Sequence, residues 1–62
     1  MVLLNSQKAV CKQLNIDPEL FVDFVNYSDD YPDSTFDDIV NDLGVSYQQA
    51  FKLCKLFDKF GL

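Results

Sequence analysis

Apolar residues recur at helical spacing in four stretches of the chain, and short polar stretches separate them. The first stretch predicts a helix that begins at Val2 or Ser6 and ends at Leu14. Residues 15–18 then end this helix. A new helix starts there, because Asp17 is a favoured N-cap and Pro18 a favoured first helical residue. The expected buried stripe of the first helix consists of Leu3, Val10 and Leu14, with Cys11 beside it.

The second and third predicted helices flank an acidic loop. The second helix is expected from Pro18 to about Tyr27, and residues 28–33 read as a loop of short polar residues around a proline. The third helix begins after Ser34 or Thr35, since either side chain can cap it. The expected buried faces are Leu20, Phe21, Phe24 and Val25 in the second helix, and Phe36, Ile39, Val40 and Leu43 in the third.

A glycine turn joins the third predicted helix to a fourth. Gly44 ends the third helix, most easily in a left-handed conformation, and Ser46 opens a capping box with Gln49. The fourth helix is expected from about Tyr47 to Phe60. No stretch alternates with the period of two that marks a strand. The predicted class is therefore all-α, a compact bundle of four short helices in one domain spanning residues 1–62. The core-facing residues of the fourth helix are expected to be Ala50, Leu53, Cys54 and Phe57.

The spacing around the glycine turn is that of helix-turn-helix units. Ile39 and Leu43 lie four residues apart, Gly44 follows, and Ala50 is small enough to let two helices approach closely. An ordinary corner between two helices produces the same capping signals. We expect a helix-turn-helix formed by the last two helices, although that fold alone does not fix its ligand.

The segment from Val45 to Leu62 resembles the recognition helix of winged-helix proteins. It is similar both to MarR-type repressors and to the DNA-reading gamma domain of FtsK-type translocases. The gamma domain has, in order, a tyrosine, an alanine, a basic residue and a glycine at the places of Tyr47, Ala50, Lys52 and Gly61. The acidic and aromatic run at residues 18–25 is also similar to the first helix of that domain. The resemblance implies a DNA-binding fold.

Two features depart from those families. Asn41 and Asp42 stand where the families carry arginines before the turn. The families also continue past the glycine and leucine into a β-hairpin wing, whereas the sequence ends at Leu62. We therefore expect the phosphate contacts of a wing to be missing.

Charge is arranged in blocks along the chain. The net charge is −5, and the stretch from Asp17 to Asp42 contains nine of the ten acidic residues and no lysine. Both flanks of this acidic block are net basic. Arginine, which is best suited to bidentate contacts with phosphate and guanine, is absent from the sequence. The basic residues are Lys8, Lys12, Lys52, Lys55 and Lys59.

A fourth helix placed in a major groove would turn its outward residues toward DNA. Gln48 can hold an adenine edge through two hydrogen bonds, and lysines can reach guanine or phosphate. Three lysines give few phosphate contacts, so a single copy should bind weakly and with strong salt dependence, and we expect a homodimer. The alternative is an ordinary solvated helix face. The candidate DNA-binding residues are Ser46, Tyr47, Gln48, Lys52, Lys55 and Lys59.

The acidic block also fits a different function, that of a protein-binding module. An anionic surface can bind the basic groove of a host nucleic-acid-binding protein, as acidic inhibitors and DNA mimics of viruses and mobile elements do. Apolar residues on the fourth helix beyond its core stripe would extend that surface, unless the first helix covers them. The simplest alternative for the acids is solubility and helix capping. The candidate partner-binding residues are Asp30, Asp37, Asp38, Asp42, Phe51, Leu56 and Phe60.

Several classes of function have no candidate residues in the sequence. Histidine is absent, there is no glycine-rich phosphate loop, and Asp29, Asp30 and Asp33 lack calcium-loop spacing. We therefore expect no enzyme activity, cofactor, metal or small-molecule substrate. No apolar run approaches the roughly 18 residues of a membrane span, and no basic leader precedes the first apolar residues. We expect a cytoplasmic protein in which Cys11 and Cys54 are reduced.

Overall fold

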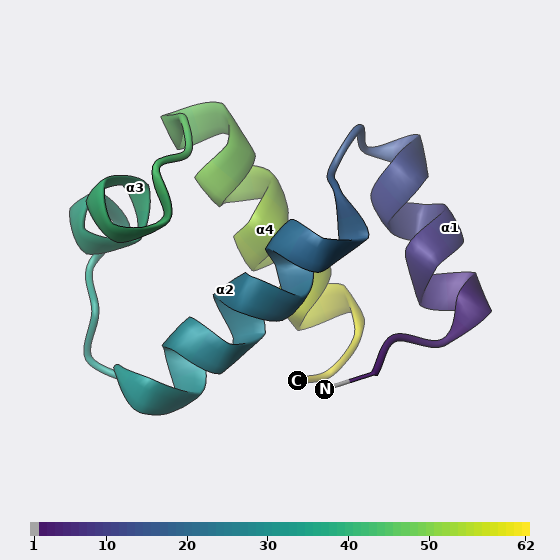
Figure 1. Cartoon of the computed structure of the whole chain (residues 1–62), viewed down its shortest axis with the longest axis horizontal. Helices are drawn as coiled ribbons and strands as arrows, with labels where there is room; N and C mark the ends of the chain where they lie inside the picture. The colour runs from purple at the N-terminus through teal and green to yellow at the C-terminus, as the bar shows by residue number, and fades with distance from the viewer. Residues whose placement is uncertain (1) are drawn as a thin grey trace.

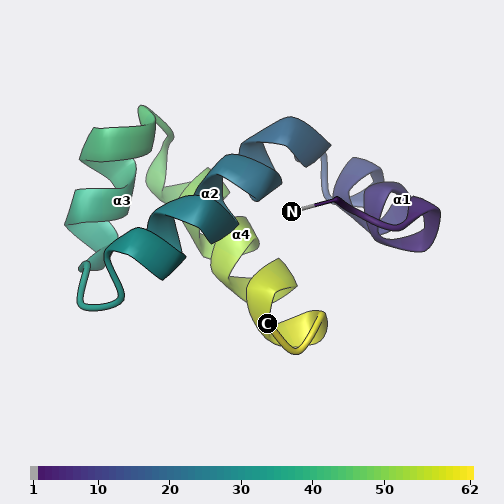
Figure 2. The same cartoon turned by 60° about the horizontal axis from the view of Figure 1, so that its bottom comes forward.

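Helices α1 and α3 lie at opposite ends of the molecule, and α2 and α4 cross between them (Figure 1). The computed structural model describes residues 2–62, and all regular secondary structure in this range is helical. Figure 2 shows the same arrangement after a rotation, with α1 and α3 still at the two ends of the longest dimension, which is 28 Å. The prediction of an all-α bundle of four short helices is confirmed. The helices are α1 (Asn5–Gln13), α2 (Pro18–Asp30), α3 (Phe36–Leu43) and α4 (Tyr47–Lys59).

Helix α1 begins at Asn5, between the two predicted starts. The side chain of Gln7 accepts a hydrogen bond of 2.9 Å from the N–H of Leu4, which satisfies one backbone donor at the helix start. At the other end the chain turns through Asn15 at a φ of +60°. Asparagine tolerates this left-handed conformation better than most residues, so the local sequence accounts for the turn.

The predicted buried stripe of α1 is partly wrong. Leu14 is 36% exposed because it follows the last helical residue and turns away from the core. Leu3 is buried, but from the extended segment before the helix. Cys11, which was expected beside the stripe, is fully buried. Cys11 is therefore the residue that α1 itself buries in the core.

Helix α2 begins as predicted and ends later than predicted. The Asp17 carboxylate accepts from the N–H of Glu19 at 3.0 Å, and Pro18 is the first helical residue. The loop predicted at residues 28–33 is wrong over its first three residues, because α2 continues to Asp30. A proline outside a helix disfavours the helical conformation of the residue directly before it and leaves earlier residues free to be helical. Tyr31 is that residue, and the helix stops there.

The core is built on α2, which contacts α1, α3 and α4. Phe21 is fully buried and meets Phe60 edge to face, with ring centroids 5.4 Å apart. Phe24 meets Phe57 in the same way at 5.7 Å. Such edge-to-face pairs add stabilisation beyond the burial of their area. The buried residues are Leu3, Cys11, Ile16, Phe21, Phe24, Val25, Ile39, Val45, Ala50, Leu53 and Leu56.

The buried stripe of α4 is rotated relative to the prediction. Ala50, Leu53 and Leu56 are fully buried, whereas Cys54 and Phe57 are half-buried at the edge of the core. The expectation that Leu56 belongs to a partner surface is therefore wrong, because positions 50, 53 and 56 follow one helical face. Cys11 and Cys54 are free thiols, and burial raises the pKa of both.

Within residues 2–62, none of the helices combines the length and the apolar character that crossing a bilayer requires.

Candidate nucleic-acid interface

A three-residue turn positions α4 against α3. Thr35 caps α3, and the Asp38 carboxylate accepts a hydrogen bond of 3.0 Å from the N–H of Thr35. Gly44 ends α3 at a φ of +66°, in the left-handed region as predicted. Ser46 then caps α4 by accepting from the N–H of Gln49 at 3.2 Å. Both boundaries of the turn are thus determined by local residues, Gly44 by its backbone conformation and Ser46 by its side chain.

The buried residue within the turn is Val45. It anchors the turn in the core between the exposed residues Gly44 and Ser46. A turn of three residues that contains glycine, between two helices in contact, is the arrangement expected of a helix-turn-helix. It leaves the solvent side of α4 uncovered by α3.

The solvent side of α4 carries most of the basic charge of the molecule. Three of the five lysines of the chain lie on it, and two of these are exposed while Lys52 is half-buried. The only acidic residue of α4 is Asp58. We call this surface the outer face of α4, and it consists of Gln48, Phe51, Lys52, Lys55 and Lys59.

Phe51 lies on the outer face and is 53% exposed. The ammonium group of Lys55 stands over its ring, 4.8 Å from the centroid. A cation at this distance is attracted by the ring face, so Lys55 is held close to the helix surface. A ligand can stack on the exposed ring of Phe51, and an anionic ligand can bind the ammonium group of Lys55 beside it.

Tyr47 is held at the junction of α3 and α4. Its ring stacks on Phe36, with centroids 6.2 Å apart and planes within 1° of parallel. Its hydroxyl donates to an Asp37 oxygen at 2.5 Å, and this hydrogen bond to a carboxylate raises the pKa of Tyr47. Phe36, expected on the buried face of α3, is 37% exposed because it covers the Tyr47 ring instead. Tyr47 is therefore fixed to α3 before any ligand binds.

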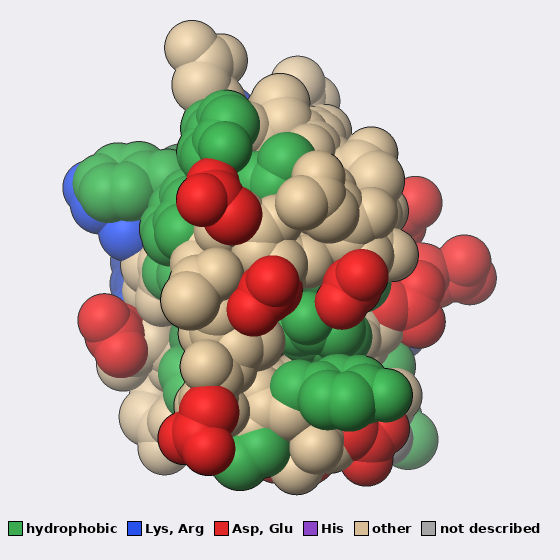
Figure 3. All heavy atoms as spheres, turned by 90° about the vertical axis from the view of Figure 1, so that its left-hand side faces the viewer, with side chains coloured by type: hydrophobic (Ala, Val, Ile, Leu, Met, Phe, Trp, Pro, Cys, Tyr) green, Lys and Arg blue, Asp and Glu red, His purple; other side chains and the backbone are tan. Residues whose placement is uncertain are grey.

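The opposite side of α3 borders an acidic hollow. Tyr27 donates to an Asp42 oxygen at 2.6 Å, and this hydrogen bond raises the pKa of Tyr27 to about 12. The ring of Tyr31 lies 5.1 Å from that of Tyr27. Figure 3 shows the α3 end of the molecule, with carboxylates spread over it and lysines only at its margin. The acidic hollow is lined by Tyr27, Asp30, Tyr31, Pro32, Asp33, Ser34, Asp38 and Asp42.

The predicted DNA-binding residues fall into two groups. Gln48, Lys52, Lys55 and Lys59 share the outer face of α4. Ser46 is engaged as the helix cap, and Tyr47 is engaged with α3. The sequence predicted the capping role of Ser46 but not the contact of Tyr47 with α3, because the hydrogen bond from Tyr47 to Asp37 joins residues of two different helices.

The predicted partner-binding residues are also divided by the fold. Asp30, Asp38 and Asp42 meet at the acidic hollow, while Asp37 lies apart beside Tyr47. Phe60 is half-buried against Phe21, and Leu56 lies in the core. Sequence reasoning missed Tyr27 and Tyr31, whose four-residue spacing on a helix continued to Asp30 would have indicated their contact.

Comparisons with known proteins identify no relative of this chain. No family model matches the chain, and searches among curated proteins and solved structures give no match either. The resemblance to winged-helix proteins stays a prediction from the residues quoted above. Within residues 2–62, no three His, Cys, Asp or Glu side chains are grouped so that they could hold a metal ion.

Proposed function

We propose that the chain is a DNA-binding helix-turn-helix domain that contacts the duplex through the outer face of α4. The observation that carries the proposal is the charge of that face. A chain with a net charge of −5 keeps three of its five lysines on one side of one helix. Local positive charge on an acidic molecule orients it toward a polyanion.

The groups on the outer face suit a major groove. Gln48, in the first turn of α4, has the amide needed to bind an adenine edge. Lys52 and Lys59 are seven residues apart, so they are two turns apart on the same side of the helix. This spacing lets them reach successive phosphates along a backbone.

The acids of α3 restrict how DNA can approach. Asp37 and Asp38 lie in the first turn of α3, and Asp37 contacts Tyr47 at the start of α4. A phosphate at that place would meet like charge without a compensating arginine. We therefore place the contact along the middle of α4, around Phe51 and Lys55, and expect low affinity for one copy.

The test is binding to a random-sequence pool of short duplexes at about 50 mM salt, followed by selection of the bound sequences. We expect enrichment of a preferred sequence and fluorescence-anisotropy binding that falls with salt. Replacing Lys52→Gln and Lys55→Gln should weaken binding about tenfold or more, since each removes a phosphate contact. The matched control is Gln13→Glu with Asn26→Asp, which changes the net charge equally at exposed sites on α1 and α2. Equal loss in both variants would contradict the assignment of the face.

A second function is favoured by the acidic hollow. Its carboxylates stand beside two tyrosine rings, a combination that attracts the lysine or arginine side chains of a basic protein. In this function the domain would occupy the nucleic-acid site of such a protein. Asp30 and Asp42 would then contribute directly.

The two functions are separated by a capture experiment with nuclease-treated extract. Wild type is compared with the variant Asp30→Asn, Asp42→Asn, in which the amide oxygen introduced at position 42 can still accept from Tyr27. Capture of a basic protein by wild type but not by the variant would support the second function. Absence of duplex binding at about 50 mM salt together with that capture would overturn the first.

A further inference from the structure

Phe51 is the one large apolar side chain of the outer face of α4. It lies about 200° around the helix from Leu53, which is fully buried, so its ring is directed away from the core. The ammonium group of Lys55 covers part of the ring at 4.8 Å from the centroid, and 53% of Phe51 is still exposed. Asp58, the acidic residue of α4, comes about two turns later. Phe51 is therefore an apolar surface set beside cations.

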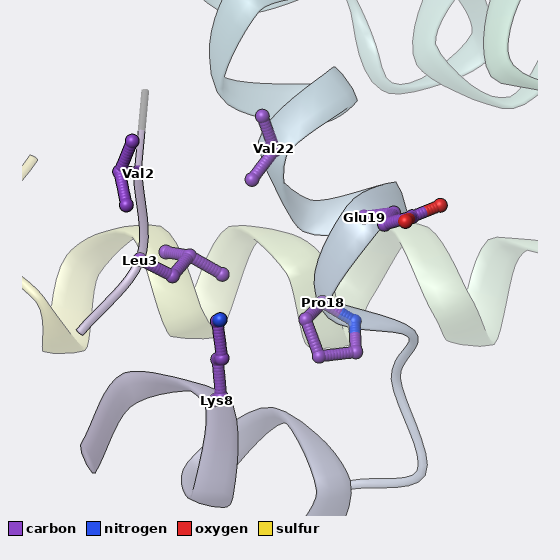
Figure 4. A pocket seen from close by; sticks show the side chains of 6 residues that line it. All are labelled: Val2, Leu3, Lys8, Pro18, Glu19 and Val22. Atoms are coloured by element: carbon purple, nitrogen blue, oxygen red, sulfur yellow. The ribbon is translucent and has the colours of Figure 1, made fainter. Parts of the chain in front are cut away.

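The charge around Phe51 distinguishes it from the apolar surface at the α1 end. A shallow hollow opens there between the N-terminal segment, α1 and α2 (Figure 4). One lysine of that hollow is balanced by one glutamate, so the hollow has no preference for an anionic ligand. The residues that line it are Val2, Leu3, Lys8, Pro18, Glu19 and Val22.

The lysines beside Phe51 favour DNA as the molecule that covers it. An apolar protein surface placed on this ring would take the ammonium groups of Lys52 and Lys55 out of water without a counter-charge, which is costly. A DNA groove offers base edges to the ring and phosphates to the lysines at the same time. This step rests on the function proposed above, the binding of duplex DNA through the outer face of α4.

The chemistry of the phenylalanine ring limits what it can recognise in a major groove. The side chain has no hydrogen-bonding group, and stacked bases offer it no ring face. Donors and acceptors make up the edges of the base pairs in this groove, apart from one apolar group, the C5-methyl of thymine. Phe51 can therefore distinguish base pairs only by contact with that methyl group.

Gln48 fixes which base pair the ring can reach. Phe51 follows Gln48 by three residues, which is about 4.5 Å along the helix axis and about 60° around it. Successive base pairs are about 3.4 Å apart, so the two side chains meet neighbouring base pairs when α4 lies along the groove. We infer that Phe51 is a specificity-determining residue that contacts the thymine methyl of the base pair next to the one whose adenine Gln48 binds. The preferred site then contains two successive A·T pairs.

The test compares two duplexes that differ only in the methyl groups. One alternates adenine and thymine, and the other has the same length and deoxyuridine in place of every thymine. Adenine is present in every base pair of both duplexes, so the contact of Gln48 is available in each. Wild type should bind the thymine duplex about three- to fivefold more tightly in fluorescence anisotropy at about 50 mM salt, the effect of burying one methyl group.

Two variants assign this preference to Phe51. Phe51→Ala should bring the ratio of the two affinities close to one and leave binding to the deoxyuridine duplex near that of wild type. Alanine is a strong helix former, so the exposed substitution preserves α4, which circular dichroism verifies. The matched control is Lys52→Gln, which should weaken binding to both duplexes equally and preserve the ratio, because it removes a phosphate contact.

The possible failures separate this inference from the proposed function. A wild type that binds both duplexes equally and with salt-dependent affinity would overturn the role of Phe51 and leave duplex binding intact. A preference for thymine that persists in Phe51→Ala would also overturn it. The same holds if single-stranded oligothymidine binds more tightly than either duplex and Phe51→Ala loses that binding, because the ring then stacks on unpaired bases. Absence of binding to both duplexes would overturn the inference and the proposed function together.

Discussion

Gly44 carries the turn that sets α4 against α3. Its φ is +66°, and no atom outside its neighbours lies within 4 Å of the place where a Cβ would stand. The requirement for glycine is therefore conformational and not steric. The sequence predicted this residue correctly because a left-handed helix end is a local property of one position.

Gly44→Ala should destabilise the domain by about 1–2 kcal/mol, the strain of placing alanine in the left-handed region. Urea unfolding followed by circular dichroism measures the change. Gly44→Asn is the matched control and should cost less, because asparagine tolerates this conformation. An alanine variant as stable as wild type would show that the turn relaxes to another geometry.

The hydrogen bond from Tyr27 to Asp42 should make the domain less stable at alkaline pH. Its folded pKa of about 12 lies above the unfolded value of about 10, because the neutral hydroxyl donates to Asp42. The contribution of this hydrogen bond is therefore complete below pH 10 and lost as the pH rises through about 12. The unfolding midpoint of wild type should fall more steeply over this range than that of Tyr27→Phe. Parallel profiles would exclude the hydrogen bond as the cause.

At the scale of elements, the sequence predicts where the helices begin but not which of their faces are buried. Asp17, Thr35 and Ser46 each satisfy backbone donors within three residues, so the sequence alone locates the starts of three helices. The exposure of Leu14 and the burial of Leu56 depend on neighbours distant in sequence. A helix with apolar residues around much of its circumference does not reveal which side its neighbours cover.

Leu56→Ala tests the corrected face of α4. A fully buried leucine replaced by alanine should cost about 2–5 kcal/mol, which is a large part of the stability of a domain this small. Leu14→Ala removes the same atoms from an exposed position and should change stability by less than about 0.5 kcal/mol. If the two variants lowered the urea midpoint equally, the result would contradict the burial of Leu56.

At the scale of the whole molecule, charge is separated between two surfaces. The acidic hollow and the first turn of α3 occupy one end, and the outer face of α4 carries three lysines along its length. The sequence indicated the acidic block and its basic flanks. The joining of Asp30, Asp38 and Asp42 at one hollow required the packing of α2 against α3, which local spacing does not specify.

The salt dependence of duplex affinity tests the central proposal most directly. Each neutralised phosphate contributes about −0.9 to the slope of log affinity against log salt, so the lysines of the outer face should give a slope of about −2 to −3 per copy. The double variant Lys52→Gln, Lys55→Gln should reduce that slope by about two units. A chain that fails to bind duplex at about 50 mM salt, or a variant with the wild-type slope, would contradict DNA binding through the outer face of α4.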